Sequence, residues 1–303
     1  MEPHLLVLII IGGVLILLVG IYFLVSYALV RYLSYPKKHE TEWTHKCDVD
    51  KGLIPEDMSY LKREKLQIKA RDGVIIECDF SLKENHRGIV VLAHGYTWTR
   101  EGCLKYAQFL YKHGFSIFLF DERGHGYSKF KYPTMGYLEG KDICDIVDYL
   151  RDRFGKDVVI GLHRESMGAA SVMMSLGYGA DVQFAIEDCG YSSLKELIKY
   201  KLKGMHLPLF LLWGCNLIMK RMVKYCLEDV NPSKNASISD IPLLIVHGED
   251  DDFVPFAQSK VVYEENKEHA EIYTVKGAEH AKSYETDPIK YEETVMAFIN
   301  KNI

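Results

Sequence analysis

Residues 5–30 form an unbroken run without a single charged side chain. A run of this kind can satisfy its backbone hydrogen bonds inside a bilayer as a helix, and about 20 apolar residues suffice to cross the hydrocarbon core. A cleaved secretory signal would carry cations before the apolar run, whereas only Glu2 and His4 precede this one. The run therefore predicts an uncleaved transmembrane anchor over residues 1–33.

Three cations, Arg31, Lys37 and Lys38, follow the apolar run, and none precedes it. Lys and Arg close to a membrane-spanning helix favour its cytoplasmic side. We therefore predict a single-pass protein of the cell membrane that contacts the lipid bilayer through residues 5–30. The remainder of the chain is then expected in the cytoplasm.

The remainder of the chain is predicted to form one globular domain that follows a short linker. Residues 34–60 are polar and contain Pro36 and Pro55, which predicts an irregular linker. Residues 61–303 are enough for one large domain. The chain has 37 Lys and Arg against 42 Asp and Glu, so its charge of −5 offers no basic surface for nucleic acid. Seven cysteines without a C-x-x-C pair suggest neither a disulfide framework nor a zinc site.

Short apolar runs alternate with stretches of helical spacing throughout this domain. The expected strands are residues 65–70, 74–82, 89–93, 115–120, 158–160, 184–187, 243–246 and 271–275. Alternation of this kind predicts a parallel sheet with helices on both faces. The Asp72-Gly73 turn between the first two strands predicts an antiparallel hairpin at the start of the sheet.

The alternation lapses for about fifty residues between Asp188 and Pro242. Residues 193–203 have helical spacing, and residues 207–213 are the most apolar stretch outside the anchor. Three interpretations remain open for this stretch: a core helix, a small cap that lines an acyl pocket, and a membrane-facing patch. We expect a small cap within about residues 193–235.

One serine lies at the turn between an expected strand and an expected helix. Ser166 follows the strand that begins at Val158 and precedes a helix rich in small residues. A sharp turn here would lift the serine hydroxyl above the sheet and point the helix N-terminus at a reacting carbonyl. A serine at the start of a helix is also a common N-cap, so this stretch alone leaves both roles open.

Five short motifs resemble those of the α/β-hydrolase superfamily, in its serine aminopeptidase-like or monoacylglycerol lipase-like branch. They are HGY at 94–96, DERGHGYS at 121–128, ESMGAAS at 165–171, HGEDDDFVP at 247–255 and GAEHAKSY at 277–284. The resemblance covers the region from about Glu64 to Ile303. It implies the α/β-hydrolase fold: a mostly parallel, doubly wound sheet with an N-terminal antiparallel hairpin and a small helical cap, here preceded by one transmembrane helix.

The resemblance also implies a triad of Ser166 as nucleophile, Asp251 as acid and His280 as base. A serine hydroxyl is a weak nucleophile until a neutral imidazole takes its proton, and a buried carboxylate holds that imidazole in the required tautomer. Asp250 and Asp252 are alternatives to Asp251. Only Asp251 leaves the family's spacing of two residues before the Val-Pro pair.

The same resemblance assigns the oxyanion hole to the backbone N–H groups of Tyr96 and Met167. No metal and no organic cofactor is implied. The predicted function is a membrane-anchored serine hydrolase, esterase/lipase-like or aminopeptidase-like. It would cleave a carboxylic ester, thioester or amide of a small-molecule acyl substrate through an acyl-enzyme.

Arg164 is the one departure from the family pattern, because a small residue, usually Gly, stands two positions before the nucleophile. We expect its side chain to leave this crowded place for solvent, for Glu165 or for the acidic run 250–252, and to lower turnover. Alternatively, Gly161 and the strand twist absorb the bulk without consequence. The alternative function is a catalytically impaired hydrolase-fold protein that binds an acyl ligand or a partner.

The predicted orientation can be tested with a reporter fused after Ile303 that is active only when exported. Because the flanking cations lie on the C-terminal side, we expect the fusion to be inactive and the same reporter at the N-terminus to be active. Activity of the C-terminal fusion would reverse the predicted orientation.

Overall fold

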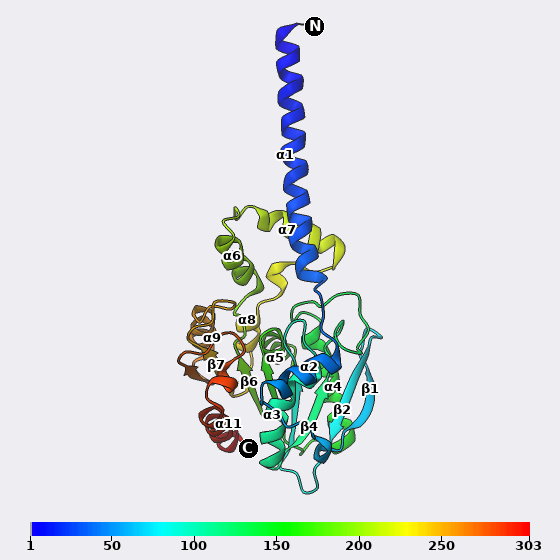
Figure 1. The fold of residues 1–303 in the computed structure, drawn as a ribbon, viewed down its shortest axis with the longest axis vertical. Helices are drawn as coiled ribbons and strands as arrows, with labels where there is room; N and C mark the ends of the chain where they lie inside the picture. Colours follow the sequence, from blue (N-terminus) through cyan, green and yellow to red (C-terminus); the bar gives the residue numbers. More distant parts are fainter. Residues whose placement is uncertain (1) are drawn as a thin grey trace.

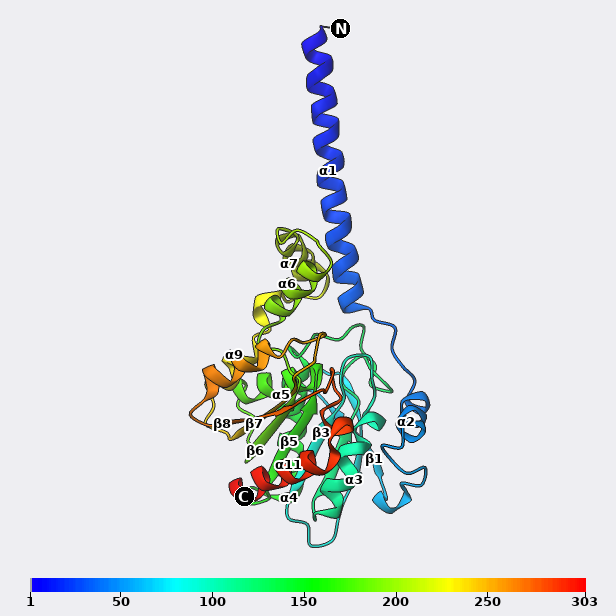
Figure 2. The same cartoon turned by 60° about the vertical axis from the view of Figure 1, so that its left-hand side comes forward.

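The computed structural model describes residues 2–303 as a long helix, a domain built on one sheet and two helices between them (Figure 1). Helix α1 (Pro3–Ser34) projects from the domain, and its apolar part is long enough to cross a membrane by length and composition. Helices α6 (Leu194–Gly204) and α7 (Leu211–Met222) lie beside its base (Figures 1 and 2).

The sheet has eight strands in the order β1-β2-β4-β3-β5-β6-β7-β8. These are β1 (Glu64–Lys69), β2 (Ile75–Ser81), β3 (Ile89–Ala93), β4 (Ser116–Phe120), β5 (Ile160–Glu165), β6 (Phe184–Asp188), β7 (Leu243–Gly248) and β8 (Ala270–Val275). Strand β2 runs antiparallel to β1 and to β4, and the other neighbours are parallel. The predicted α/β-hydrolase fold, with its opening hairpin, is confirmed.

Alternate residues of the central strands point into two separate cores. Ile89 and Val91 of β3 face α4 (Glu139–Phe154) and α5 (Met167–Gly177). Val90 and Leu92 face α3 (Leu104–Lys112) and α11 (Pro288–Asn302), which lie on the other face of the sheet (Figure 2). Both faces are apolar because a sheet covered on two sides needs continuous rather than alternating hydrophobic strands. The remaining helices are α2 (Thr41–Asp50), α8 (Pro232–Ala236), α9 (Ala257–Asn266) and α10 (Ser283–Thr286).

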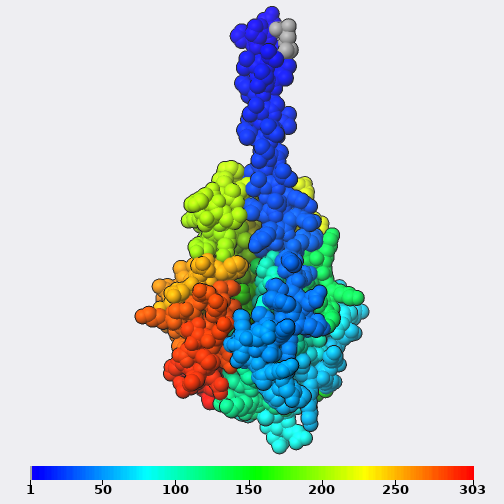
Figure 3. Space-filling model, in the orientation of Figure 1, coloured from blue at the N-terminus to red at the C-terminus, as the bar shows by residue number. Residues whose placement is uncertain are grey.

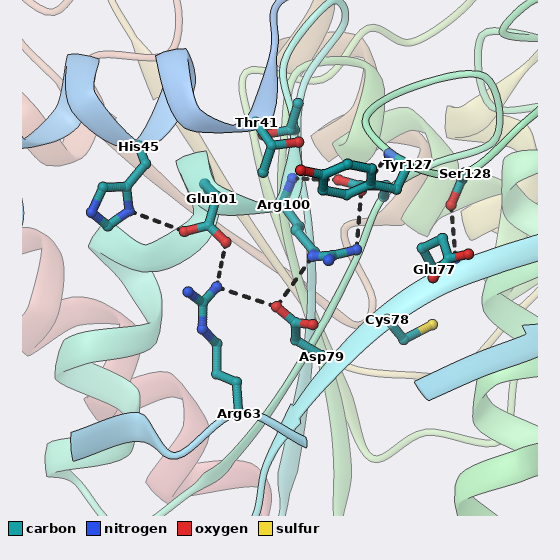
Figure 4. A network of polar contacts seen from close by, with 12 residues as sticks. Thr41, His45, Arg63, Glu77, Cys78, Asp79, Arg100, Glu101, Tyr127 and Ser128 are labelled. Atoms are coloured by element: carbon teal, nitrogen blue, oxygen red, sulfur yellow. Dashed lines mark hydrogen bonds and ion pairs between the residues drawn. The ribbon is translucent and has the colours of Figure 1, made fainter. Parts of the chain in front are cut away.

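The segment expected to be an irregular linker contains helix α2, so that part of the prediction is wrong. Its sequence has no apolar face, and polar contacts with the domain hold it instead. Thr44 and Thr99 hydroxyls lie 2.5 Å apart, and His45 Nδ1 is 3.0 Å from Glu101 Oε2. Arg63 bridges Glu101 to Asp79, whose Oδ2 is 3.2 Å from the Arg63 Nη1 (Figure 4). Tertiary contacts therefore override a weak local preference.

Helices α6 and α7, with the segment between them, form the cap, and they divide the apolar stretch 207–213 between interior and surface. Helix α7 begins only at Leu211, whose side chain is buried, whereas Phe210 and Trp213 are each 65% exposed. At Gly214 an added Cβ would lie 2.4 Å from Ser26 Oγ, so glycine allows α7 to approach α1 closely. The space-filling view shows the cap directly against the lower part of α1 (Figure 3).

Candidate active site

Ser166 occupies the turn between β5 and α5 with φ 55° and ψ −121°, a conformation that non-glycine residues rarely adopt. Its N–H donates to the Asp188 carbonyl at 2.8 Å. At Gly168 an added Cβ would lie 2.8 Å from the His94 carbonyl oxygen, so only glycine permits this approach. Ser166 makes no side-chain capping hydrogen bond, which leaves its hydroxyl available for other partners.

The structure brings the three predicted triad residues together from the ends of three strands. Ser166 Oγ lies 2.8 Å from His280 Nε2, and His280 Nδ1 lies 2.7 Å from Asp251 Oδ2. Asp251 follows β7 and His280 follows β8. Asp250 and Asp252, the two alternatives, are exposed to solvent, whereas Asp251 is buried.

Asp251 is fixed by partners on both of its carboxylate oxygens. Oδ1 accepts from the N–H groups of Phe253 and Val254 at 2.9 and 2.8 Å, while Oδ2 faces His280 and, at 3.2 Å, His247 Nε2. Burial alone would raise the pKa of Asp251, but the hydrogen bonds from His247 and His280 outweigh burial and hold it below its usual range. The carboxylate is therefore charged at neutral pH and able to orient the imidazole.

The predicted oxyanion donors lie next to the serine. Met167 is the first residue of α5, and Tyr96 follows Gly95, where an added Cβ would be 3.4 Å from Ser166 Cβ. Within residues 2–303 neither the Tyr96 nor the Met167 N–H donates to an acceptor of the chain. Two backbone donors beside one hydroxyl could stabilise the oxyanion of a tetrahedral intermediate.

Cys189, Asp251 and His280 place possible metal ligands within 4.8 Å of one another. The chemistry of this set does not fit a metal well. Both Asp251 oxygens already accept hydrogen bonds, and burial raises the pKa of the Cys189 thiol well above its ordinary value. Metals bind the thiolate rather than the thiol, so the cluster is better described as a hydrogen-bonded relay beside a buried thiol.

Arg164 does not take any of the routes expected from the sequence. Its side chain is fully buried on the face of the sheet that carries α4 and α5, with Nη1 3.2 Å from Glu122 Oε1 and the guanidinium 4.3 Å from the centre of the Phe120 ring. Strand alternation explains this placement, because Arg164 shares a face with Leu162. The side chain packs against Gly168, where an added Cβ would lie 3.3 Å from Arg164 Cδ, so this glycine makes room for the arginine.

The side chains of Arg164 and Glu122 are both fully buried. Burial raises the pKa of Glu122 above its usual range, and the Arg164 guanidinium partly offsets this rise. Burial likewise lowers the pKa of Arg164, which the carboxylate of Glu122 opposes. Each group therefore depends on the other to remain charged in the interior.

A cavity of about 430 Å³ adjoins the serine. Its walls come from the cap (Leu197, Leu202, Met219), from the turns near the serine (Tyr96, Met167, Val254) and from α1 (Leu29, Val30, Tyr32, Leu33). No local pattern in the sequence indicates the contribution of α1 to the cavity, because the whole run 5–30 was predicted to contact the bilayer. In the structure Ser26 and Val30 of that run are buried against the protein.

Comparisons with known proteins agree with this architecture. Residues 84–186 match the model of the serine aminopeptidase family, S33. The uncharacterized protein YqkD of Bacillus subtilis (strain 168) is 27% identical over 275 residues, covering 88% of this chain and 90% of its own. The uncharacterized protein YfhR of Escherichia coli (strain K12) is 24% identical over 247 residues, covering 78% and 80%.

Solved structures share the fold. The Pyrococcus furiosus esterase Pf2001 aligns with a TM-score of 0.67 and 23% identity, over 82% of this chain and 95% of its own. A puromycin-hydrolyzing peptidase of Mycobacterium tuberculosis aligns with a TM-score of 0.64 and 16% identity, over 81% of this chain and 40% of its own. Proteins with this fold therefore include both esterases and peptidases.

The buried pair predicts a stability change that distinguishes single from double substitutions. Arg164→Met should lower the free energy of unfolding by about 3–5 kcal/mol, because it leaves Glu122 buried without its partner. Adding Glu122→Gln should recover most of that loss. Arg153→Met, which breaks the exposed pair with Glu64 (2.9 Å), should cost at most about 1 kcal/mol.

Thermal unfolding of the detergent-solubilised chain at pH 7 measures the stability of the Arg164→Met, double and Arg153→Met variants. Equal losses in the single and double variants would mean that Arg164 acts through its packing on Phe120 rather than through its charge.

Proposed function

We propose that this chain, a member of the α/β-hydrolase superfamily, is a membrane-anchored serine hydrolase that cleaves an ester-type bond of a substrate with an apolar acyl part. The observation that carries this proposal is the relay from Ser166 through His280 to Asp251 at the wall of an apolar cavity. In this proposal three residues act in the relay and two backbone N–H groups form the oxyanion hole.

In the proposed reaction Ser166 Oγ attacks the acyl carbonyl carbon while His280 Nε2, 2.8 Å away, takes the hydroxyl proton. The charged Asp251 stabilises the imidazolium that forms. The N–H groups of Tyr96 and Met167 receive the carbonyl oxygen as it becomes an oxyanion.

The intermediate collapses as His280 gives its proton to the leaving oxygen, which leaves the acyl group on Ser166. A water molecule then attacks this acyl-enzyme while His280 takes its proton. Collapse of the second tetrahedral intermediate returns the proton to Ser166 Oγ and releases the carboxylic acid. The relay is therefore restored after each turnover.

The cavity favours an acyl chain over an aminoacyl group. Apart from Ser166, Lys201 and Cys215, its lining consists of aliphatic, aromatic and methionine side chains, and no acidic residue is among the described residues that line it. An aminopeptidase needs a carboxylate to hold the substrate's ammonium group, and the one charged lining residue is instead Lys201. Its Nζ lies 3.7 Å from the centre of the Phe253 ring. Electrostatics thus oppose a cationic substrate and favour an uncharged or anionic one.

Three features support membrane anchoring by α1. Pro3 to Ile21 stands clear of the cap and spans about 28 Å at about 1.5 Å per residue, close to the thickness of a bilayer core. Beyond it, Ser26, Val30 and Ser34 are buried in the domain, so cleavage of a signal sequence near this point would expose a packed surface. The helix is thus better suited to remain attached than to be removed.

The cap supplies the third feature. Phe210 and Trp213 are exposed beside Tyr22, with ring centroids 5.6 and 6.4 Å from that of Tyr22, and aromatic side chains of this kind favour the membrane interface. Residues 194–224 carry seven Lys and Arg against one Glu, although the whole chain has a net charge of −5. A basic, aromatic surface beside the apolar helix suits an anionic lipid surface.

Covalent labelling tests the nucleophile. In the full chain solubilised in detergent, a fluorophosphonate probe should label the wild type and the control Ser237→Ala, whose hydroxyl is exposed and far along the chain. Ser166→Ala should not be labelled, and His280→Ala should be labelled at least about 10²-fold more slowly. Labelling of Ser166→Ala at the wild-type rate would refute the proposed nucleophile.

Substrate profiling tests the acyl preference. With p-nitrophenyl esters of graded chain length and with aminoacyl anilides, kcat/KM should be highest for medium-chain esters because the cavity is apolar and lacks a carboxylate. Equal or better activity on the aminoacyl anilides would favour the aminopeptidase alternative instead.

A further inference from the structure

The last two turns of α1 line the cavity of the candidate active site. Leu29, Val30 and Leu33 line the same cavity as Ser166. Val30 is only 1% exposed and belongs to the same apolar cluster as Met167, the residue that follows the serine. A helix that would otherwise serve as a tether thus provides one wall of the substrate cavity.

A hydrogen bond connects this helix end to the oxyanion loop. The Tyr96 hydroxyl lies 2.7 Å from the Leu33 carbonyl oxygen and 3.2 Å from that of Tyr32. Carbonyl groups in the last turn of a helix have no partner within the helix, so they are available to such a donor. Tyr96 is also the residue whose backbone N–H we assign to the oxyanion hole.

The backbone next to Tyr96 is strained and is held from several sides. Thr97 has φ 68°, its N–H donates to His125 Nε2 at 3.2 Å, and its carbonyl accepts from the His39 N–H at 3.0 Å. The position of the Tyr96 N–H is therefore set by contacts to the residues just after α1 as well as by strand β3, which ends three residues earlier. Strain of this kind persists only where the surroundings enforce it.

The base of α1 is fixed to the cap by separate contacts. The Tyr22 hydroxyl donates to the Phe210 carbonyl at 3.1 Å, and Gly214 leaves room for Tyr22 and Ser26. These contacts dock α1 on the cap before Val30 and Leu33 reach the cavity.

We propose that the C-terminal two turns of α1 are a working part of the active site. Val30 and its neighbours set the length of acyl chain that the cavity accepts, and Tyr96 is a positioning residue that couples the end of α1 to the oxyanion hole. This inference rests on the proposed function. It assigns the acyl-length selection to the helix that also carries the chain into the bilayer.

The first test changes the α1 wall. Val30→Trp should lower kcat/KM for long-chain p-nitrophenyl esters about tenfold more than for the acetate, and Val30→Ala should shift the preference toward longer chains. Val19→Trp, a matched change at an exposed position of the same helix, should alter neither. All variants are measured as full chains in the same detergent, with fluorophosphonate labelling as the measure of folded enzyme.

The second test removes the hydrogen bond but keeps the aromatic ring. Tyr96→Phe should lower kcat about tenfold with little change in KM, because the oxyanion donor acts in the transition state and losing such a donor outright costs about 10²–10³. The control is Tyr132→Phe, whose hydroxyl also donates to a backbone carbonyl, that of Met222 at 3.3 Å. It should keep kcat within about twofold.

The outcomes separate this inference from the proposed function. If Ser166 is labelled normally but the Val30 variants keep the wild-type chain-length profile, α1 does not select the substrate. If Tyr96→Phe behaves like Tyr132→Phe, the coupling to the oxyanion hole is wrong. If the wild-type chain is not labelled at Ser166, the proposed function itself fails.

Discussion

The left-handed backbone at Ser166 is the constraint on which the rest of the site depends. A serine at φ 55° stores about 1–3 kcal/mol of strain, so its surroundings must enforce the turn. The hydrogen bond to the Asp188 carbonyl and the close approach of Gly168 to the His94 carbonyl do this. The turn directs the Ser166 Oγ to His280 and places the Met167 N–H at the N-terminus of α5.

The sequence predicts those parts of the fold that depend on local patterns of apolar and polar residues. Continuous apolar strands such as Ile89–Ala93 indicate a sheet covered on both faces, and the helices between them indicate parallel connections. Helix α2 was not predicted because it is stabilised by long-range polar contacts, such as that of Thr44 with Thr99, 55 residues away. The position of Arg164 was not predicted because the family pattern specifies residue types at the turn, whereas strand alternation decides that its side chain shares a face of β5 with Leu162.

The contribution of α1 to the cavity also could not be read from the sequence. Composition identifies an apolar run that suits a bilayer, and nothing local separates its lipid-facing part from its protein-facing part. The decisive contacts are long-range: Leu33 meets Tyr96 63 residues away, and Tyr22 meets Phe210 188 residues away. Gly214 contributes to this packing through its small size, and that role is visible only once α7 is seen against α1.

The two sides of the site are held by different kinds of interaction. On the sheet side, buried ion pairs tie the ends of β4 and β5 to each other and to the residues packed around them: Arg100 with Asp121 at 3.0 Å, Arg164 with Glu122 at 3.2 Å and Lys105 with Glu165 at 2.8 Å. Buried pairs add little net stability, but they are directional, so they fix the loops around the serine. On the side of α1 and the cap the contacts are mainly apolar, and such contacts tolerate small shifts of whole helices. In the proposed function, the sheet side therefore sets the reaction geometry and the helical side accommodates the acyl chain. The Tyr96 hydroxyl donates a hydrogen bond to the Leu33 carbonyl and so connects the sheet side to the helical side. A shift of α1 would therefore be transmitted to the oxyanion loop.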